Sequence, residues 1–243
     1  MKNFYNLWAL LVFITIMLLI IPIIFLGSLF GTKGINFNYK VVNLWAKTWF
    51  LCIGIKYKLT YETPHDKNKQ YIFIANHQSY LDAATIALSI TQPFRVLGQY
   101  ETSTVPFLGY IWKTCVITVK RGEISSRIES VRRLKSEIIK GVSIFLFPEG
   151  KFNDSDDVLC KFYDGAFRIA IETQTPIKPM LLLDTGKRLH YSEILGLNPG
   201  YNRVIYLDEV DVTGLTLNDV TLLKEKVFSL MESSLINYKL GYL

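Results

Sequence analysis

The chain has few cysteines and no closely spaced pair of them. Its 243 residues include three, Cys52, Cys115 and Cys160, and no two have Cys-x-x-Cys spacing. This excludes a closed disulfide framework and a zinc knuckle, and it predicts reduced thiols in a chain that faces the cytosol. No repeat period is present, which excludes a solenoid, and a mean hydropathy of +0.23 excludes a disordered tail protein. The length suits one domain with an appendage.

Acidic residues are absent from the first quarter of the chain. No Asp or Glu precedes Glu62, whereas six of the 27 basic residues do. The rest of the chain balances 21 basic against 21 acidic side chains, so the formal charge of +6 belongs to the N-terminal segment. A segment that is both basic and apolar predicts contact with anionic membrane lipids. A nucleic-acid-binding protein would instead carry a basic patch on a soluble fold, so nucleic acid is not expected as a partner.

Charge of either sign is absent between Lys2 and Lys33. The centre of this stretch, Leu7–Leu26, has the length of roughly 20 residues that a membrane-spanning helix needs, and we expect an N-terminal membrane helix. No second stretch is comparably apolar, which excludes a multi-span transporter. A cleaved signal peptide fits less well, because the apolar run is long and no small-x-small cleavage site follows it. Pro22 leaves open a re-entrant segment that turns back before crossing.

The segment Phe37–Tyr57 has an amphipathic pattern. Trp45 and Trp49 fall near one helical face, while Lys40 and Lys47 fall elsewhere. This pattern predicts a helix that lies at the membrane interface, and the alternative is a helix packed on the soluble domain.

The N-terminal pattern also predicts domains and orientation. We expect a membrane anchor over residues 1–60 and a soluble domain over residues 61–243. Lys33, Lys40 and Lys47 follow the apolar stretch, whereas only Lys2 precedes it. The positive-inside rule therefore places the soluble domain on the cytoplasmic side of an inner (cytoplasmic) membrane.

Short apolar runs alternate with amphipathic segments from Tyr71 onward. This predicts an α/β fold with a mixed, largely buried sheet flanked by helices. The expected strands are Tyr71–Ala75, Arg95–Leu97, Cys115–Val119, Val142–Phe147, Ile177–Leu183 and Arg203–Glu209. The expected helices are Asp82–Ser89, Ser126–Lys140, Ala166–Thr173 and Leu217–Lys239. In the second of these, Ile128, Val131, Leu134 and Ile138 repeat at helical spacing, Ser126 and Glu129 form a capping pair, and Gly141 ends the helix.

A histidine and an aspartate follow the first of these expected strands. His77 stands at the strand end, and Asp82 begins the next helix five residues later. If the loop bends back, the carboxylate can fix the imidazole tautomer and leave the other ring nitrogen as a general base. The spacing alone is weak evidence, because Asp82 can equally cap the helix.

A second element, Phe147-Pro148-Glu149-Gly150, follows the apolar run Val142–Phe147. A carboxylate and a glycine at the carboxyl end of a buried strand lie where open α/β sheets bind ligands. Because each element follows a predicted strand, the two together favour a functional site much more strongly than either does alone.

Together these motifs resemble the glycerolipid acyltransferase family, to which 1-acyl-sn-glycerol-3-phosphate acyltransferases belong. Four blocks of the family occur here in the same order over about Tyr71–Leu183. They are Asn76-His77 with Asp82; Pro106-Phe107-Leu108-Gly109 running to Val119-Lys120-Arg121; Phe147-Pro148-Glu149-Gly150; and Thr175-Pro176-Ile177-Lys178-Pro179.

The resemblance implies a membrane-bound enzyme that moves an acyl group from acyl-CoA or acyl carrier protein to the hydroxyl of a lyso-lipid. His77, oriented by Asp82, would take the hydroxyl proton. The substrate would contact Asn76, Arg121, Glu149 and Gly150: Arg121 would hold the acceptor phosphate, Glu149 would position acceptor hydroxyls, and backbone N–H groups around Gly150 would face the oxyanion. No metal and no organic cofactor is implied. The absence of a Gly-x-Ser-x-Gly motif agrees with direct transfer without an acyl-enzyme.

The sequence departs from the family at two places. After Glu149-Gly150 the family has Thr-Arg, where this chain has Lys151-Phe152. Gln99 and Tyr100 stand where the family often has lysine. Lys151 and Lys161 can replace the missing cations only as point charges. The acceptor is therefore open between 1-acyl-sn-glycerol-3-phosphate and a lyso-lipid with another head, such as an acylated amino acid.

Two further alternatives remain at this stage. A transacylase that takes its acyl chain from a phospholipid would carry the same motifs, and a non-catalytic lipid-binding protein could keep the fold. His65 and His190 lie in polar stretches, and we expect no role in the site for either.

Overall fold

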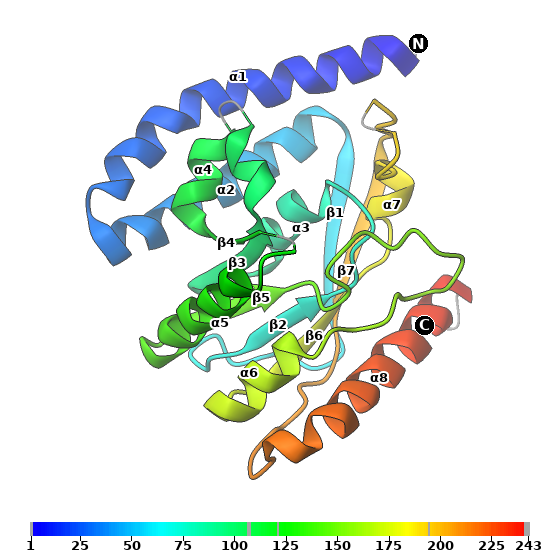
Figure 1. Cartoon of the computed structure of the whole chain (residues 1–243). Helices are drawn as coiled ribbons and strands as arrows, with labels where there is room; N and C mark the ends of the chain where they lie inside the picture. Colours follow the sequence, from blue (N-terminus) through cyan, green and yellow to red (C-terminus); the bar gives the residue numbers. More distant parts are fainter. Residues whose placement is uncertain (1, 106–107, 121, 194, 241–243) are drawn as a thin grey trace.

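The chain forms an α/β fold around one seven-stranded sheet (Figure 1). The structure, a computed structural model, describes residues 2–105, 108–120, 122–193 and 195–240. The strands are β1 (Ile55–Tyr61), β2 (Ile72–Ala75), β3 (Phe94–Gln99), β4 (Val116–Val119), β5 (Ser143–Leu146), β6 (Ile177–Leu182) and β7 (Gly200–Tyr206). The helices are α1 (Lys2–Ser28), α2 (Gly31–Cys52), α3 (Asp82–Ser89), α4 (Leu108–Cys115), α5 (Ile124–Ile139), α6 (Gly165–Thr173), α7 (Thr185–Arg188) and α8 (Val220–Leu240), with short 3-10 segments at Tyr100–Thr104 and Leu217–Asp219.

The sheet is mixed, as the sequence predicts. Its strand order is β1-β7-β6-β2-β5-β3-β4. The five strands from β6 to β4 run parallel, whereas β7 is antiparallel to β6 and β1 is parallel to β7. The carboxyl ends of the five parallel strands therefore share one edge of the sheet, where α/β proteins place their sites.

Helices cover both faces of the sheet, so its central strands are apolar on both sides. In β2, Ile72 and Ile74 pack in the core beneath α5, α6 and α8. Phe73 and Ala75 point to the other face, where they pack with Ile86 of α3. Helices α1, α2 and α4 extend that second layer (Figure 1). This two-sided burial explains why the strands occur in the sequence as continuous apolar runs.

The expected strands and helices are confirmed to within a few residues, with differences at α5. Gly141 ends α5 with a φ of 87°, as expected. The capping pair is wrong: α5 begins at Ile124, and the hydroxyl of Ser126 accepts a hydrogen bond from the backbone N–H of Lys120. Ile128, the first of the four apolar residues at helical spacing, is 65% exposed and lies outside the core.

Helices α1 and α2 form an antiparallel hairpin that lies along the domain. Near the start of α1, the Tyr5 hydroxyl donates to the carbonyl of Ile53 at 2.6 Å and Asn6 accepts from the N–H of Leu197 at 3.1 Å. Near its end, the hydroxyl of Ser28 forms a hydrogen bond of 3.0 Å with the hydroxyl of Tyr110 in α4. Since both ends of the helix contact the domain, α1 packs on it along its length of about 40 Å.

The other side of α1 is apolar and open. We call its exposed side chains the outer face of α1: Phe4, Leu7, Trp8, Leu10, Leu11, Ile14, Leu18, Leu19, Ile23, Phe25 and Leu26. Among the described residues, the segment Phe4–Ser28 is the one helix long and apolar enough to cross a membrane.

Helix α2 differs from the amphipathic helix expected over Phe37–Tyr57. It begins at Gly31 and ends at Cys52, and the next residues enter β1. Trp45 and Trp49 are buried, and each makes an edge contact with the Phe13 ring of α1. The tryptophan face of α2 is therefore packed inside the protein, which agrees with the alternative of a helix packed on the domain. Strand β1 also spans the expected domain boundary between residues 60 and 61, because its backbone pairs with β7 far along the chain.

Candidate functional site

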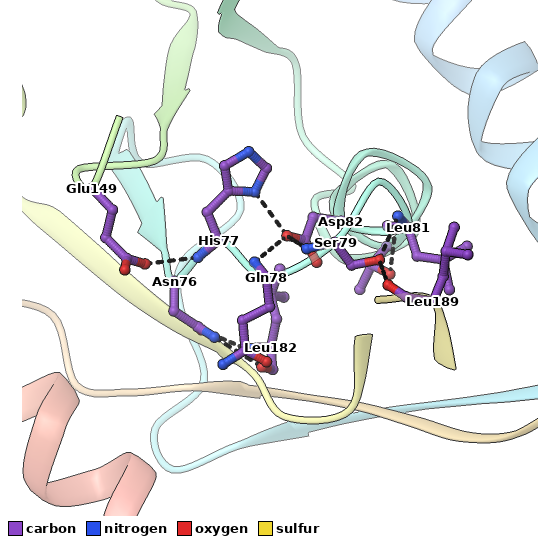
Figure 2. A network of polar contacts seen from close by, with 10 residues as sticks. Asn76, His77, Gln78, Ser79, Leu81, Asp82, Glu149, Leu182 and Leu189 are labelled. Carbon is purple, nitrogen blue, oxygen red and sulfur yellow. Dashed lines mark hydrogen bonds and ion pairs between the residues drawn. The ribbon is translucent and has the colours of Figure 1, made fainter. Parts of the chain in front are cut away.

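The two sequence elements meet at the carboxyl edge of the parallel strands. His77 follows β2, Glu149 follows the neighbouring β5, and Asp82 is the first residue of α3 (Figure 2). The loop of residues 76–81 bends back because the Asp82 N–H donates to the carbonyl of Ser79 at 3.1 Å. The structure thus brings together the residues that the sequence places on separate segments.

The His77 ring donates to the Asp82 carboxylate. His77 Nδ1 lies 2.8 Å from Asp82 Oδ2, which also accepts the backbone N–H groups of Gln78 at 2.8 Å and Ser79 at 2.9 Å (Figure 2). Asp82 is fully buried, whereas the His77 side chain is 19% exposed. Because an ionised carboxylate only accepts, this contact places the ring proton on Nδ1 and leaves Nε2 with a free lone pair.

Two phenylalanine rings flank the imidazole. Phe147 stacks on His77 with ring centroids 3.8 Å apart and planes 11° apart, and the Phe152 ring lies 4.3 Å away. Phe152 in turn contacts the rings of Tyr80 and Tyr191. These contacts fix the ring orientation and place an aromatic wall beside it, at the position where the family has an arginine.

Glu149 is buried and bonded to two backbone segments. Its side-chain oxygens accept the N–H of His77 at 2.8 Å and the N–H of Cys160 at 2.7 Å. Burial raises the pKa of Glu149 to about 7, although the two N–H donors favour the charged form. With the residue 1% exposed and both oxygens occupied, the expected contact with acceptor hydroxyls is not supported. The carboxyl instead joins the His77 loop to the segment before α6.

Asn76 does not face the site either. Its amide donates to the carbonyl of Leu182 at 2.9 Å and accepts the N–H of the same residue at 2.8 Å. The side chain is 1% exposed, so the expected substrate contact is corrected to a bond that joins the end of β2 to β6.

Gly150 shapes the turn after β5. Its φ is 67°, and a Cβ there would lie 2.9 Å from the Tyr163 ring, so a side chain does not fit. Its backbone N–H donates to the carbonyl of Phe147 at 3.1 Å. This N–H is therefore engaged in the turn, and the expected role of the backbone N–H groups around Gly150 toward the oxyanion stays a prediction.

Two of the three expected cationic residues lie within the described part of the chain. Lys151 is exposed and forms an ion pair with Asp154 at 2.5 Å, which raises the pKa of the lysine. Lys161 is exposed on the segment that leads to α6. Arg121 lies outside the described residues. Among the residues that are described, no cluster of three or more His, Cys, Asp or Glu side chains could hold a metal ion.

Sequence reasoning missed three contributors to the site. Ser79 is buried, donates to the carbonyl of Leu189 at 2.5 Å, and accepts the N–H of Leu81 at 3.0 Å (Figure 2). Phe152 and Tyr191 form the aromatic wall. The substitution of Phe152 for the family arginine was a signal for the wall. The contact between Ser79 and Leu189 had no signal in the sequence, because the two residues are 110 positions apart.

Comparison with known proteins shows which family this chain belongs to. A family model described as Acyltransferase matches residues 56–183, more than half of the chain. The chloroplastic 1-acyl-sn-glycerol-3-phosphate acyltransferase BAT2 of Brassica napus is 31% identical over 181 residues, covering 73% of this chain and 51% of that protein. The Arabidopsis thaliana enzyme LPAT1 is 30% identical, with 73% and 49% covered. This chain thus spans about half the length of these two relatives.

Two bacterial proteins match over more of their length. The Escherichia coli 1-acyl-sn-glycerol-3-phosphate acyltransferase is 26% identical, with 75% of this chain and 74% of that protein covered. The crystal structure of the LPA acyltransferase PlsC from Thermotoga maritima superposes with a TM-score of 0.76 over 98% of each chain. At 21% identity this similarity shows a shared fold. The family model matches residues 56–183, which contain the His77–Asp82 pair, and the fold is shared with a solved member. The chain therefore belongs to the glycerolipid acyltransferase family.

Proposed function

We propose that the chain is a membrane-bound O-acyltransferase. It moves a fatty acyl group from acyl-CoA or acyl carrier protein to the free hydroxyl of 1-acyl-sn-glycerol-3-phosphate and so forms phosphatidic acid. The observation that carries this proposal is the His77 ring, held by the buried Asp82 at the carboxyl edge of the sheet, within the segment that matches the family.

The chemistry follows from that pair. His77 Nε2 takes the proton of the acceptor hydroxyl as its oxygen attacks the thioester carbonyl. The carbon–oxygen bond forms, the carbon–sulfur bond breaks, and the imidazolium returns its proton to the leaving thiolate. Asp82 stabilises the imidazolium in between. The thioester supplies the activated acyl group, so no metal or organic cofactor is needed.

Glu149 has a positioning role in this proposal. Its carboxyl holds the backbone of His77 and Cys160 at 2.8 and 2.7 Å, which fixes the loop that carries the base. Catalytic groups must be held within fractions of an ångström of their productive geometry, so a loosened loop would slow the reaction.

One observation favours a second acceptor. The Phe152 ring beside His77 offers no charge to a phosphate, and Lys151 is paired with Asp154. A lyso-lipid with a phosphate-free head, such as an acylated amino acid, needs no such cation. For 1-acyl-sn-glycerol-3-phosphate, the phosphate would depend on Arg121, with Lys161 as a further cation.

We also propose that α1 lies in the membrane interface and does not cross the bilayer. Both of its ends bond to the domain, at Asn6 and at Ser28, while its outer face is apolar and open. A helix fixed lengthwise on a folded domain buries its open side in the headgroup and acyl boundary. This arrangement brings the site to lyso-lipids in the leaflet, and the N-terminal lysines suit an anionic cytoplasmic surface.

Acyl transfer by the purified full-length protein in detergent tests the proposal. Radiolabelled acyl-CoA or acyl carrier protein is offered with 1-acyl-sn-glycerol-3-phosphate and, separately, with a phosphate-free lyso-lipid. We expect product with the first acceptor, and loss of it in a His77→Ala variant whose unfolding transition matches the wild type. Product with the second acceptor alone would keep the mechanism and change the substrate.

Three outcomes would contradict the proposal. Full transfer by His77→Ala would exclude this ring as the base. No product from either thioester, with product when a diacyl phospholipid is supplied as donor, would identify a transacylase. No product with any donor would favour a non-catalytic lipid-binding protein.

A further inference from the structure

A basic cavity lies at the opposite edge of the sheet from His77. Its volume is about 460 Å³, and it opens at the amino ends of β3 and β4. Gly31 and Ile35 of α2 line one side, and the second half of α5 lines the other. Both helices are visible on the β3–β4 side of the molecule in Figure 1. Since His77 follows the carboxyl end of β2, the cavity is not part of the acyl-transfer site.

The cavity carries more positive than negative charge. Its cations are Arg95, Arg132, Arg133 and Lys140. Glu137 binds two of them, Arg95 at 3.3 Å and Lys140 at 2.9 Å, and Glu129 binds Arg132 at 2.8 Å. Four cations thus face two carboxylates.

Arg133 lines the cavity and differs from its neighbours because it makes no hydrogen bond and no close ion pair within the described part of the chain. The Glu129 carboxylate, which is bonded to Arg132, attracts it only through space. Arg95 beside it is 5% exposed and held by the Phe94 carbonyl at 2.9 Å, so one wall has a fixed guanidinium. Guanidinium groups bind phosphate oxygens through two parallel hydrogen bonds. The N-terminus of α2, which has no side-chain cap, adds positive potential at Gly31.

The surface next to the cavity is apolar. Leu29 and Phe30, which join α1 to α2 just before Gly31, are 65% and 74% exposed. A free phosphate would gain nothing from these side chains, whereas a lipid places acyl chains directly beside its headgroup. We propose that this cavity binds the phosphate of an anionic phospholipid, with the lipid chains against Leu29 and Phe30.

This inference rests on the membrane placement proposed above and on no step of acyl transfer. Such a site would hold the hairpin tip to the bilayer at a second point, away from the reacting lipid. It would also make membrane binding depend on lipid charge at a defined position, in addition to the diffuse attraction of the N-terminal lysines.

Vesicle binding by the full-length protein tests the site. Sedimentation with phosphatidylcholine vesicles is compared with sedimentation with vesicles that also contain phosphatidylglycerol. Arg133→Gln should weaken binding to the anionic vesicles about five-fold and leave binding to the neutral ones unchanged. Arg168→Gln is the matched control, because Arg168 is an exposed arginine on α6 with no partner among the described side chains.

A second variant separates a defined site from general attraction. Ser136 lines the cavity, and Ser136→Leu fills part of it without changing charge. We expect this variant to lose affinity for anionic vesicles as Arg133→Gln does. Equal binding by wild type and Ser136→Leu, or equal losses in Arg133→Gln and Arg168→Gln, would overturn the proposal.

Inorganic phosphate distinguishes the source of the ligand. Titrated into the detergent-solubilised protein at constant ionic strength, it should produce a far smaller thermal shift than phosphatidylglycerol in mixed micelles. An equal shift that Arg133→Gln removes would assign the cavity to free phosphate and overturn the lipid assignment. Acyl transfer is measured on the same samples, so an inactive wild type that still prefers anionic vesicles would refute only the proposed function.

Discussion

His77 and Asp82 operate as a unit in the proposed reaction, because one Asp82 oxygen holds both the imidazole and the loop that carries it. Oδ2 accepts from His77 Nδ1 and from two backbone N–H groups. A neutral amide in its place still occupies the space, but it no longer balances the imidazolium charge.

We therefore expect Asp82→Asn to lower kcat on the order of 10²-fold or more, with a much smaller change in KM. Steady-state acyl transfer measures both. The double variant His77→Ala/Asp82→Asn should be no slower than His77→Ala alone, since groups that act together are not additive. Independent, multiplying losses would show that Asp82 acts by another route.

Glu149 makes stability depend on pH. Burial raises its pKa in the folded protein to about 7, from 4.5. The folded state thus binds one more proton than the unfolded state between these values, and the free energy of unfolding falls as pH rises through this window. The stabilisation is complete below about pH 4.5 and is lost above about pH 7, by an amount on the order of 3 kcal/mol.

Urea unfolding at several pH values in detergent measures this change. Glu149→Gln should be less stable than wild type at low pH, because its amide N–H meets a backbone donor. Its free energy of unfolding should also change less with pH between pH 4.5 and 7. Glu225→Gln, at an exposed position on α8, is the control and should keep the wild-type slope. A wild-type slope in Glu149→Gln would assign the pH dependence to other groups.

At the scale of elements, α1 has two sides with different functions. Ile24 is fully buried against the domain, whereas Leu18 on the outer face is 49% exposed. The first side stabilises the fold, and the second is available to lipid.

Ile24→Ala should lower the free energy of unfolding by about 2–5 kcal/mol through loss of core packing. Leu18→Gln should change it by no more than about 0.5 kcal/mol, yet weaken binding to vesicles about ten-fold. Denaturation in detergent and vesicle sedimentation provide the two readouts. If Leu18→Gln instead destabilises the protein and leaves vesicle binding intact, the outer face is covered by protein and not by lipid.

The hairpin of α1 and α2 is also connected directly to the sheet. Residues at the end of α2 lead directly into β1, which pairs with β7 over the full strand, and Trp45 and Trp49 pack under α1. The N-terminal segment is thus built into the sheet layer.

At the scale of the whole molecule, this integration predicts that α1 cannot be removed as a separable anchor. A chain of residues 31–243 would expose the apolar residues of α2 that pack against α1, among them Trp45 and Trp49. We expect it to aggregate, or to unfold at much lower denaturant concentration than the full chain. Size-exclusion chromatography and urea unfolding in detergent check this, and a monodisperse, equally stable fragment would restore the expected two-part organisation.

Local patterns predicted much of the architecture. The apolar runs of β2, β5 and β6 are visible because helices cover both faces of the central sheet, and α3 has the bounds that the sequence predicts. Strand β1 was missed because it alternates exposed and half-buried residues and follows α2 without a clear break. Its first three residues, Ile55–Tyr57, fall within the segment that the pattern predicts as an amphipathic helix.

The sequence by itself determined the α/β class, the order of the motifs and the apolar and basic N-terminus, because each depends on residues close together in the chain. The short spacing of His77 and Asp82 allowed their pairing, and the bend of the loop between them made it. The tertiary structure decided that Asn76 binds Leu182, that Glu149 binds the backbone of His77, and that α1 lies along the domain. These contacts join segments 106, 72 and up to 191 residues apart. A buried polar group bonds to whichever partner the fold brings near it, and the residues next to it in sequence do not indicate which partner that is.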